Sequence, residues 1–219
     1  MNAVLGIYGA QGHGRDVDFM IEELQALDPS IEVVYIDDNF SSSHSLNLRV
    51  MNFEMFLAER AAIKEVCIAI GRVDVRKRLS KICAEAGIAA RSLISARAVV
   101  SRYAEIGKGA LVGPHSIVSA NVKIGDFFQA NSLCNVAHDC RLGNYVTLGP
   151  GVLCNGNVHM GDNVYVGAGA IIKQGQNDRP RLIGRNAVIG MGAVVLADVP
   201  DGAVVAGNPA AAIRWNSYC

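Results

Sequence analysis

Histidine is the residue type in this sequence best suited to acid–base chemistry, and one of the five histidines has an informative setting. His138 lies in residues 135–140, which read NVAHDC. An imidazole with a pKa near 6.5 can accept a proton at neutral pH. Because any single histidine is more often structural or exposed than catalytic, His138 needs a second indication. Its place outside an apolar repeat supplies one, since it predicts a side chain that faces solvent or a neighbouring subunit.

The repeat is an apolar residue at every sixth position from Ile94 to Ile172. The row comprises Ile94, Val100, Ile106, Val112, Val118, Ile124, Ala130, Val136, Leu142, Leu148, Cys154, Met160, Val166 and Ile172. A period of six fits neither an α-helix nor a plain strand. The next residue is often Gly, and the fifth position of each hexad is mostly small or β-branched. We therefore predict a coiled strand that turns a corner every six residues, with aliphatic side chains filling a triangular interior and glycine easing the bends.

The repeat also predicts which residues are neighbours in space. Three hexads, or 18 residues, make one coil, so Gly156 follows His138 by one coil. Residues in register on adjacent coils should lie about 4.8 Å apart. The alternative for Gly156 is an ordinary turn glycine among the 23 glycines of the chain.

The rhythm breaks once, after Ile172. It resumes at Ile183, so five residues are inserted around positions 176–182. Arg179 and Arg181 lie in this predicted loop, where they could meet phosphate groups or be solvated like most exposed arginines.

Before the repeat, residues 1–92 alternate predicted strands and helices. Strands are predicted at 3–8, 32–36, 66–70 and 89–93, helices from about 17 to 28, 53–60 and 75–86, and a serine-rich loop at 41–45. This alternation predicts a small parallel sheet, and ligands of such sheets lie beyond the carboxyl ends of the strands. Five candidate residues fall at those ends: Gly12, His13, Asp37, Asp38 and Gly71. Aspartate is also common in ordinary strand-end turns.

Composition excludes some classes of partner. Twenty basic and twenty acidic residues cancel among 219, which gives no electrostatic case for nucleic acid or an anionic membrane. The start has no basic n-region and no apolar run approaches the length of a membrane span, so we expect a cytoplasmic protein. The six cysteines form no CxxC pair, and Cys134, Cys140 and Cys154 take inward positions, so we expect no disulfide and no zinc or other metal site.

Three motifs in order resemble one family. They are residues 9–14 (GAQGHG), the His-Asp-Cys coil at 138–140 and residues 206–210 (AGNPA). The hexads resemble those of the hexapeptide-repeat acyltransferases, and the motifs resemble the members that act on sugar nucleotides. The resemblance implies a Rossmann-like α/β domain at 1–92 and a left-handed parallel β-helix at 93–219. It also implies a homotrimer, with acetyl-CoA in the grooves between subunits.

The resemblance implies three catalytic roles. His138 matches the base that takes the proton of an attacking amine, and Asp139 matches the carboxylate that raises its basicity. Gly156 matches the glycine whose N–H faces the thioester oxygen and stabilises the oxyanion. Adjacent residues of a strand point to opposite faces, so Asp139 reaches His138 only if the pair lies at a corner.

Binding roles follow in the same way. Gln11, Gly12 and His13 match the turn that holds a nucleotide diphosphate, Asp37 and Asp38 match an acidic pair that contacts the base, and Gly71 matches a strand end in that pocket. Thr147, Ala168 and Gly192 match positions along the acetyl-CoA groove. Small residues are common throughout such a helix, which is the alternative for the last three.

These implications predict an acetyl-CoA-dependent N-acetyltransferase that acts on a nucleotide-linked amino-deoxy sugar for bacterial surface glycan synthesis. Two alternatives stay open. One is O-acetylation of a sugar such as a sialic acid, and the other is a non-catalytic β-helix that acts as a scaffold.

Overall fold

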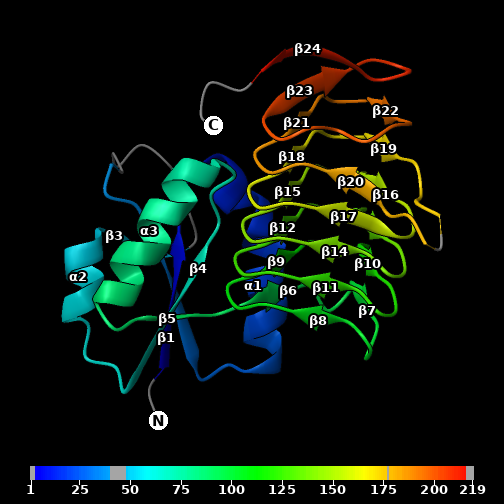
Figure 1. The fold of residues 1–219 in the computed structure, drawn as a ribbon. Coiled ribbons are helices and arrows are strands. Elements are labelled where there is room, and N and C mark those ends of the chain that lie inside the picture. Colours follow the sequence, from blue (N-terminus) through cyan, green and yellow to red (C-terminus); the bar gives the residue numbers. More distant parts are fainter. Residues whose placement is uncertain (1–2, 40–47, 177, 216–219) are drawn as a thin grey trace. The chain divides into compact units, whose positions relative to one another are not determined.

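The chain forms two compact units, Met1–Leu93 and Ile94–Cys219, in a computed structural model that describes residues 3–39, 48–176 and 178–215 (Figure 1). The predicted serine-rich loop at 41–45 and Cys219 lie outside the described residues.

The first unit is a five-stranded parallel sheet with helices. Its elements are β1 (Ala3–Tyr8), a 3-10 turn η1 (Gly12–Val17), α1 (Asp18–Leu27), β2 (Ile31–Ile36), β3 (Val50–Met51), α2 (Phe53–Ala58), β4 (Ile63–Ile68), α3 (Val73–Glu85) and β5 (Ala89–Ala90). The strand order is β3-β2-β1-β4-β5, and all pairs are parallel. The order reverses between β1 and β4, the place where open α/β sheets bind ligands.

Some boundaries differ from the prediction. β4 begins at Ile63 instead of 66, because Lys64 and Glu65 also pair with β1 although they are charged. The two-residue strand β3 was not predicted, since two residues carry no readable alternation. The strand predicted at 89–93 is divided between β5 and β6 (Leu93–Ile94), which belong to different sheets.

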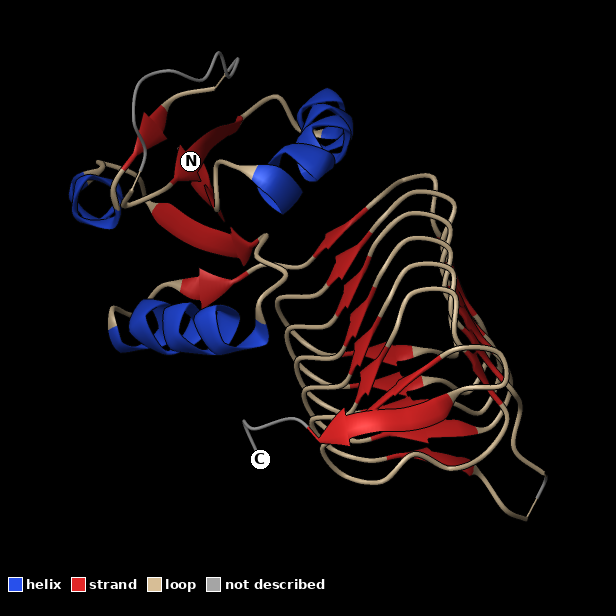
Figure 2. Ribbon diagram, turned by 90° about the horizontal axis from the view of Figure 1, so that it is seen from above, coloured by secondary structure: helices blue, strands red, loops and turns tan. Residues whose placement is uncertain are grey.

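The second unit is a parallel β-helix whose short strands stack in three walls (Figure 2). The first wall holds β6, β9 (Leu111–Val112), β12 (Gln129–Ala130), β15 (Thr147–Leu148), β18 (Tyr165–Val166), β21 (Val188–Ile189) and β23 (Ala203–Ala206), closed by antiparallel β24 (Ala211–Trp215). The second wall holds β7 (Val99–Val100), β10 (Ile117–Val118), β13 (Asn135–Val136), β16 (Leu153–Cys154), β19 (Ile171–Ile172) and β22 (Val194–Val195). The third wall holds β8 (Glu105–Ile106), β11 (Lys123–Ile124), β14 (Arg141–Leu142), β17 (Val158–Met160) and β20 (Arg181–Ile183).

The apolar row fills the interior of the helix, as predicted. From Val112 onward every member of the row is buried, together with Cys134 and Cys140 from the fifth positions. Ile94 is 41% exposed, and Val100 and Ile106 are only partly buried. These three lie in the outermost coil, which has a neighbouring coil on one side only.

The glycines that directly follow the apolar row serve the coils in a different way from the predicted one. A Cβ atom on Gly143 would lie 2.7 Å from the amide nitrogen of Asp162, and one on Gly167 would lie 2.6 Å from that of Met191. Neither glycine has a positive φ, so these residues allow adjacent coils to approach closely instead of easing a bend. The bends use residues with positive φ, which include other glycines such as Gly192, as predicted, and asparagines such as Asn121, because asparagine tolerates the left-handed region.

The predicted insertion is confirmed by the register of the strands. β17 pairs with β20 so that Met160 lies opposite Ile183, one coil plus five residues later. The extra residues form a loop after β19, and the periodic stacking continues beyond it with Ile172 opposite Val195.

Candidate active site

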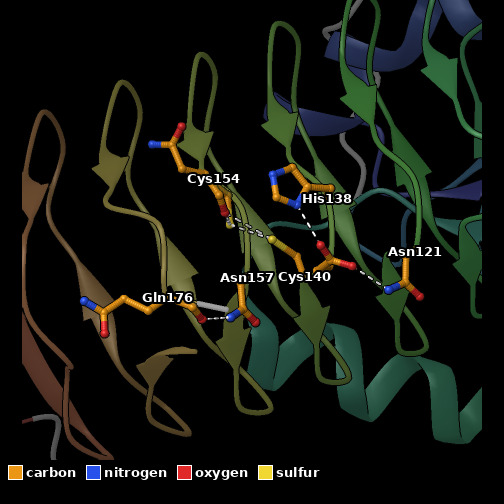
Figure 3. A network of polar contacts seen from close by, with 8 residues as sticks. Asn121, His138, Cys140, Cys154, Asn157 and Gln176 are labelled. Carbon is orange, nitrogen blue, oxygen red and sulfur yellow. Dashed lines mark hydrogen bonds and ion pairs between the residues drawn. The ribbon is translucent and has the colours of Figure 1, made fainter. Parts of the chain in front are cut away.

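His138 and Asp139 form the turn between the second and third walls, which we name the second corner. Asp139 has a φ of 61°, in the left-handed region. This sharp bend interrupts the alternation of a strand, so both side chains point the same way. Nδ1 of His138 lies 2.7 Å from Oδ2 of Asp139 (Figure 3). The corner thus brings together the two residues that a regular strand would separate.

The contact between the two side chains fixes the chemistry of the imidazole. A carboxylate at Nδ1 favours the tautomer with its proton on Nδ1, which leaves the lone pair on Nε2 free to accept another proton. The hydrogen bond from His138, followed by one from Asn121, lowers the pKa of the Asp139 carboxyl group, so this group is ionised at neutral pH. The pair can act as a general base with a stabilising anion behind it.

Gly156 lies beside the imidazole on the next coil. A Cβ atom added to Gly156 would lie 2.6 Å from both Cε1 and Nε2 of His138. Asn157 N donates to the carbonyl of His138 at 2.9 Å, which fixes the stacking of the two turns. Among the described residues, no hydrogen bond takes the amide N–H of Gly156. The structure therefore sets a backbone donor next to the predicted base.

The three predicted cofactor residues lie elsewhere on the helix. Ala168 and Gly192 stack at the turn between the first and second walls, the first corner, where Gly192 N donates to the Ala168 carbonyl at 2.8 Å. Gly192 has a φ of 65°, and a Cβ atom on it would meet nothing within 4 Å. Thr147 lies on β15 in the first wall and is only 4% exposed. One chain thus holds these residues apart from the second corner, and their roles stay predictions.

The glycine turn after β1 is tightly folded in the first unit. Gly9 has a φ of 108° and Gly12 one of 49°, both in the region that favours glycine. A Cβ atom on Gly14 would overlap the carbonyl oxygen of Gly9. Gln11 and Gly12 are exposed at this turn. The backbone conformation of the turn therefore requires glycine at all three of these positions. The turn lies exposed beyond the end of β1.

His13 is the second residue of the turn η1, and its side chain is largely buried. Its Nδ1 lies 3.6 Å from Oδ2 of Asp16. Burial lowers the pKa of His13, the positive charge of Arg76 lowers it further, and Asp16 opposes both effects. His13 is therefore neutral at pH 7, with both a donor and an acceptor nitrogen.

Asp37 and Asp38 follow β2 at the same edge of the sheet. Asp37 Oδ2 accepts from the amide of Ala10 at 3.3 Å, which ties the end of β2 to the glycine turn. Asp38 accepts from the hydroxyl of Tyr8 at 2.5 Å and from the amide of Phe53 at 2.9 Å. The two carboxylates hold the edge of the sheet together, and a contact to a bound base stays a prediction for both.

Gly71 lies beyond β4, at the same edge. Its carbonyl accepts from Nη1 of Arg76 at 3.2 Å, and that of Ile70 accepts from the same nitrogen at 2.8 Å. Arg76 is fully buried in α3, and sequence analysis missed it because it is one of several basic residues in an amphipathic helix. The signal in the sequence that could have indicated Arg76 was a charged residue on the apolar face of that helix.

The arginines of the insertion differ from each other. Nη1 of Arg181 pairs with Oδ1 of Asp198 at 2.7 Å. Arg179 is exposed in the loop. A phosphate contact by Arg181 would have to replace or share the Asp198 carboxylate.

Asn121 is a second residue that sequence analysis missed. It occupies the second corner one coil before Asp139, and its Nδ2 donates to Oδ1 of Asp139 at 2.5 Å (Figure 3). A step of 18 residues back from Asp139 would have found it.

Two features of the described residues bear on the predicted partners. No group of three or more His, Cys, Asp or Glu side chains in the described ranges could hold a metal ion. Within the same ranges, no helix has the length and apolar character needed to cross a bilayer.

A Rossmann-like unit followed by a hexapeptide β-helix with a His–Asp pair at a corner defines a class of acyltransferase. Comparison with known proteins gives the same class. The family model of the PglD N-terminal domain matches residues 4–82. The chain is 38% identical over 207 residues to the GDP-perosamine N-acetyltransferase of Escherichia coli O157:H7, with 94% of each protein covered.

Solved structures give the same result. WeeI from Acinetobacter baumannii AYE matches with a TM-score of 0.92 and 39% identity, over 96% of this chain and 100% of that one. The acetyltransferase domain of PglB from Neisseria gonorrhoeae FA1090, in complex with acetyl coenzyme A, matches with a TM-score of 0.84 and 30% identity, over 97% and 100%. The chain belongs to the family of hexapeptide-repeat N-acetyltransferases of nucleotide-linked sugars. The predicted fold class, a Rossmann-like unit followed by a left-handed parallel β-helix, is confirmed.

Proposed function

We propose that this protein transfers the acetyl group of acetyl-CoA to the amine of a nucleotide-linked amino-deoxy sugar, of the 4-amino-4,6-dideoxy type, for bacterial surface glycan synthesis. The observation that carries the proposal is the His138–Asp139 pair lying against the backbone of Gly156. Acetyl transfer to an amine needs a proton acceptor and an oxyanion donor at one place, and this corner supplies both.

Each residue of the corner has one task in the proposed reaction. Nε2 of His138 accepts the proton that the amine loses as its nitrogen attacks the acetyl carbonyl. Asp139 stabilises the resulting imidazolium, and the amide of Gly156 binds the tetrahedral oxyanion. When the C–S bond breaks, the imidazolium returns the proton to the leaving thiolate. The reaction is direct, and no acyl group is carried by the protein.

The first unit is proposed to hold the nucleotide. The exposed amides of Gln11 and Gly12 and the neutral imidazole of His13 suit diphosphate oxygens. Asp37, Asp38 and Gly71 lie at the ends of the neighbouring strands and are assigned to the remainder of the nucleotide. This division gives residues 1–92 the role of a substrate domain and residues 93–219 that of a transferase domain.

A homotrimer is proposed because one chain separates the two halves of the site. His138 lies at the second corner and Gly192 at the first, with the second wall between them. The outward side chains of that wall include exposed aliphatic residues: Val99 63%, Ile117 45%, Leu153 41% and Ile171 37%. These side chains lie on stacked strands of one wall, with Asn135 between Ile117 and Leu153, and exposed apolar groups gathered in this way favour contact with another protein surface. Packing against a neighbouring copy would bring the groove of Thr147, Ala168 and Gly192 from one subunit towards the base of another.

The test is a panel of acceptors with acetyl-CoA as donor, in which release of the CoA thiol is measured. Acetyl transfer to GDP-perosamine, or to another amino-sugar nucleotide, is expected, with an amide product by mass spectrometry. Acetyl esters formed on free sialic acid instead would assign O-acetylation. Absence of CoA binding by calorimetry would favour the non-catalytic scaffold. Sedimentation should give three chains per particle, and cell fractionation should find the protein in the cytoplasm.

A further inference from the structure

The carboxylate of Asp139 is held at both of its oxygens. Oδ2 faces Nδ1 of His138 at 2.7 Å, and Oδ1 accepts from Nδ2 of Asn121 at 2.5 Å (Figure 3). The three side chains form a continuous chain of hydrogen bonds, in the order Asn121, Asp139, His138, that ends at the imidazole.

The coil geometry makes this arrangement rigid at the backbone. Asn121 and Asp139 occupy the same turn position on adjacent coils, with φ angles of 57° and 61°. Asp139 N donates to the carbonyl of Ala120 at 3.2 Å, which fixes the distance between the two turns. Asparagine is suited to this position because it tolerates a positive φ and carries an amide donor.

A donor at Oδ1 restricts a motion that would otherwise be available. The terminal torsion of an aspartate is broad, so a carboxylate with one partner can rotate away from it. With Nδ2 of Asn121 at Oδ1, rotation breaks two hydrogen bonds instead of one. The amide adds no charge, so it orients the carboxylate and leaves it available to the imidazolium.

We propose that Asn121 is a positioning residue for the base, which acts through Asp139 and does not touch the substrates. This inference rests on the proposed function, because it assigns Asn121 to the acetyl transfer at His138. Its loss should lower kcat, since fewer molecules hold His138 with Nε2 ready to accept a proton. The KM values for sugar nucleotide and acetyl-CoA should change little.

Asn121→Gly tests the proposal without backbone strain, because glycine accepts the positive φ. We expect kcat to fall about tenfold, the scale on which groups that orient a functional side chain act, with both KM values within about twofold. Asn121→Asp keeps the size and the turn but replaces the donor with a second carboxylate, so kcat should fall at least as far. This second variant decides the matter if the glycine variant does not fold.

Asn163→Gly is the matched control. Asn163 also has a positive φ, 64°, and its Nδ2 donates across coils to Asn186 at 2.8 Å, away from the His–Asp pair. Its loss should lower the melting temperature about as much as Asn121→Gly does, with kcat retained. Equal losses of kcat in the two variants would overturn the proposal.

A double-mutant cycle separates positioning from a general structural effect. In an Asp139→Gly background, Asn121→Gly should lower kcat no further, because the group through which it acts is gone. The same fold loss in both backgrounds would overturn the proposal. Wild-type transfer to GDP-perosamine and its loss in His138→Ala test the proposed function separately. If both hold and Asn121→Gly keeps full kcat, only the role of Asn121 fails.

Discussion

Gly156 lies so close to the imidazole of His138 that a single methyl group would not fit between them. The added Cβ atom would lie 2.6 Å from Nε2, well inside van der Waals contact. Gly156 has no positive φ, so backbone conformation does not require glycine here. Only the present position of the ring excludes a larger residue, which ties the identity of this residue to the site.

Gly156→Ala should therefore damage catalysis more than stability. The ring is exposed and can turn away from the new methyl group, so the fold survives while the base leaves its place. We expect kcat to fall by about a hundredfold, within the range that a positioned general base contributes, with a melting temperature near that of the wild type.

Gly87→Ala is the control for this change. Gly87 has a φ of 73° and open space around its Cα. An alanine there should cost about 1 kcal/mol of unfolding free energy and leave kcat unchanged. A wild-type kcat in the Gly156→Ala variant would contradict the geometry of the corner.

His138→Ala should lower kcat by a factor of about 10² to 10⁴, the usual contribution of a general base. Steady-state kinetics should show KM values close to wild type, because the proposed nucleotide site lies in the other unit. His159→Gln is the comparison, since His159 faces outward on β17 in the third wall and is not part of the His–Asp pair. Wild-type kcat in His138→Ala would assign proton removal to another group or to water.

The sequence predicted the fold well because a hexad repeat is a strong local pattern. Each member of the apolar row from Val112 to Ile172 is buried where the period placed it, and the step of 18 residues placed Gly156 beside His138. The contact of His138 with Asp139 could not be derived from strand alternation. It depends on a left-handed turn residue, for which the available signal was the asparagine one coil before and one coil after Asp139, at Asn121 and Asn157.

Contacts between residues far apart in the sequence could not be predicted from local patterns. The roles assigned to Asp37 and Asp38 came from resemblance, whereas their hydrogen bonds to Ala10, Tyr8 and Phe53 join segments far apart in sequence. The exposure of Ile94 follows from its place in the outermost coil, which periodicity alone does not reveal.

The apolar row makes a prediction about stability that distinguishes its middle from its end. Leu148 is fully buried, so Leu148→Ala should lower the free energy of unfolding by about 2–5 kcal/mol. Ile94→Ala removes a side chain that is 41% exposed and should cost less than about 1.5 kcal/mol. Guanidinium unfolding followed by circular dichroism measures both, and equal costs would show that the coils are not packed as described.

The glycine turn of the first unit offers a second contrast. Gly14→Ala places a methyl group on the carbonyl of Gly9, a backbone atom that cannot move without breaking the hydrogen bond from Gly9 N to Ile36. We expect a loss of about 3 kcal/mol, the upper range for overpacking, and a large rise in the KM for the sugar nucleotide. Gly12→Ala meets open space and introduces only the strain of a φ of 49°. It should therefore lose about 1 kcal/mol.

The buried histidine of the same turn predicts how stability depends on pH. The pKa of His13 is lowered below the ordinary value of 6.5, and burial is the main cause. The unfolded chain then binds a proton more readily than the folded one, so stability is full above pH 6.5 and falls as pH drops towards the folded pKa. Below that pKa the loss stops growing.

His13→Gln should remove this part of the pH dependence. The free energy of unfolding is measured for wild type and His13→Gln at pH 7.5 and at lower pH. The difference between the two proteins should shrink as the pH falls, by at most about 1.4 kcal/mol per pH unit. His159, whose pKa burial also lowers, contributes equally to both proteins and cancels. Asp16→Asn should act in the opposite direction, because Asp16 raises the pKa of His13 and its loss deepens the acid effect. Parallel pH profiles for wild type and His13→Gln would mean that His13 is solvated, and a neutral imidazole could then not be assigned to the nucleotide site.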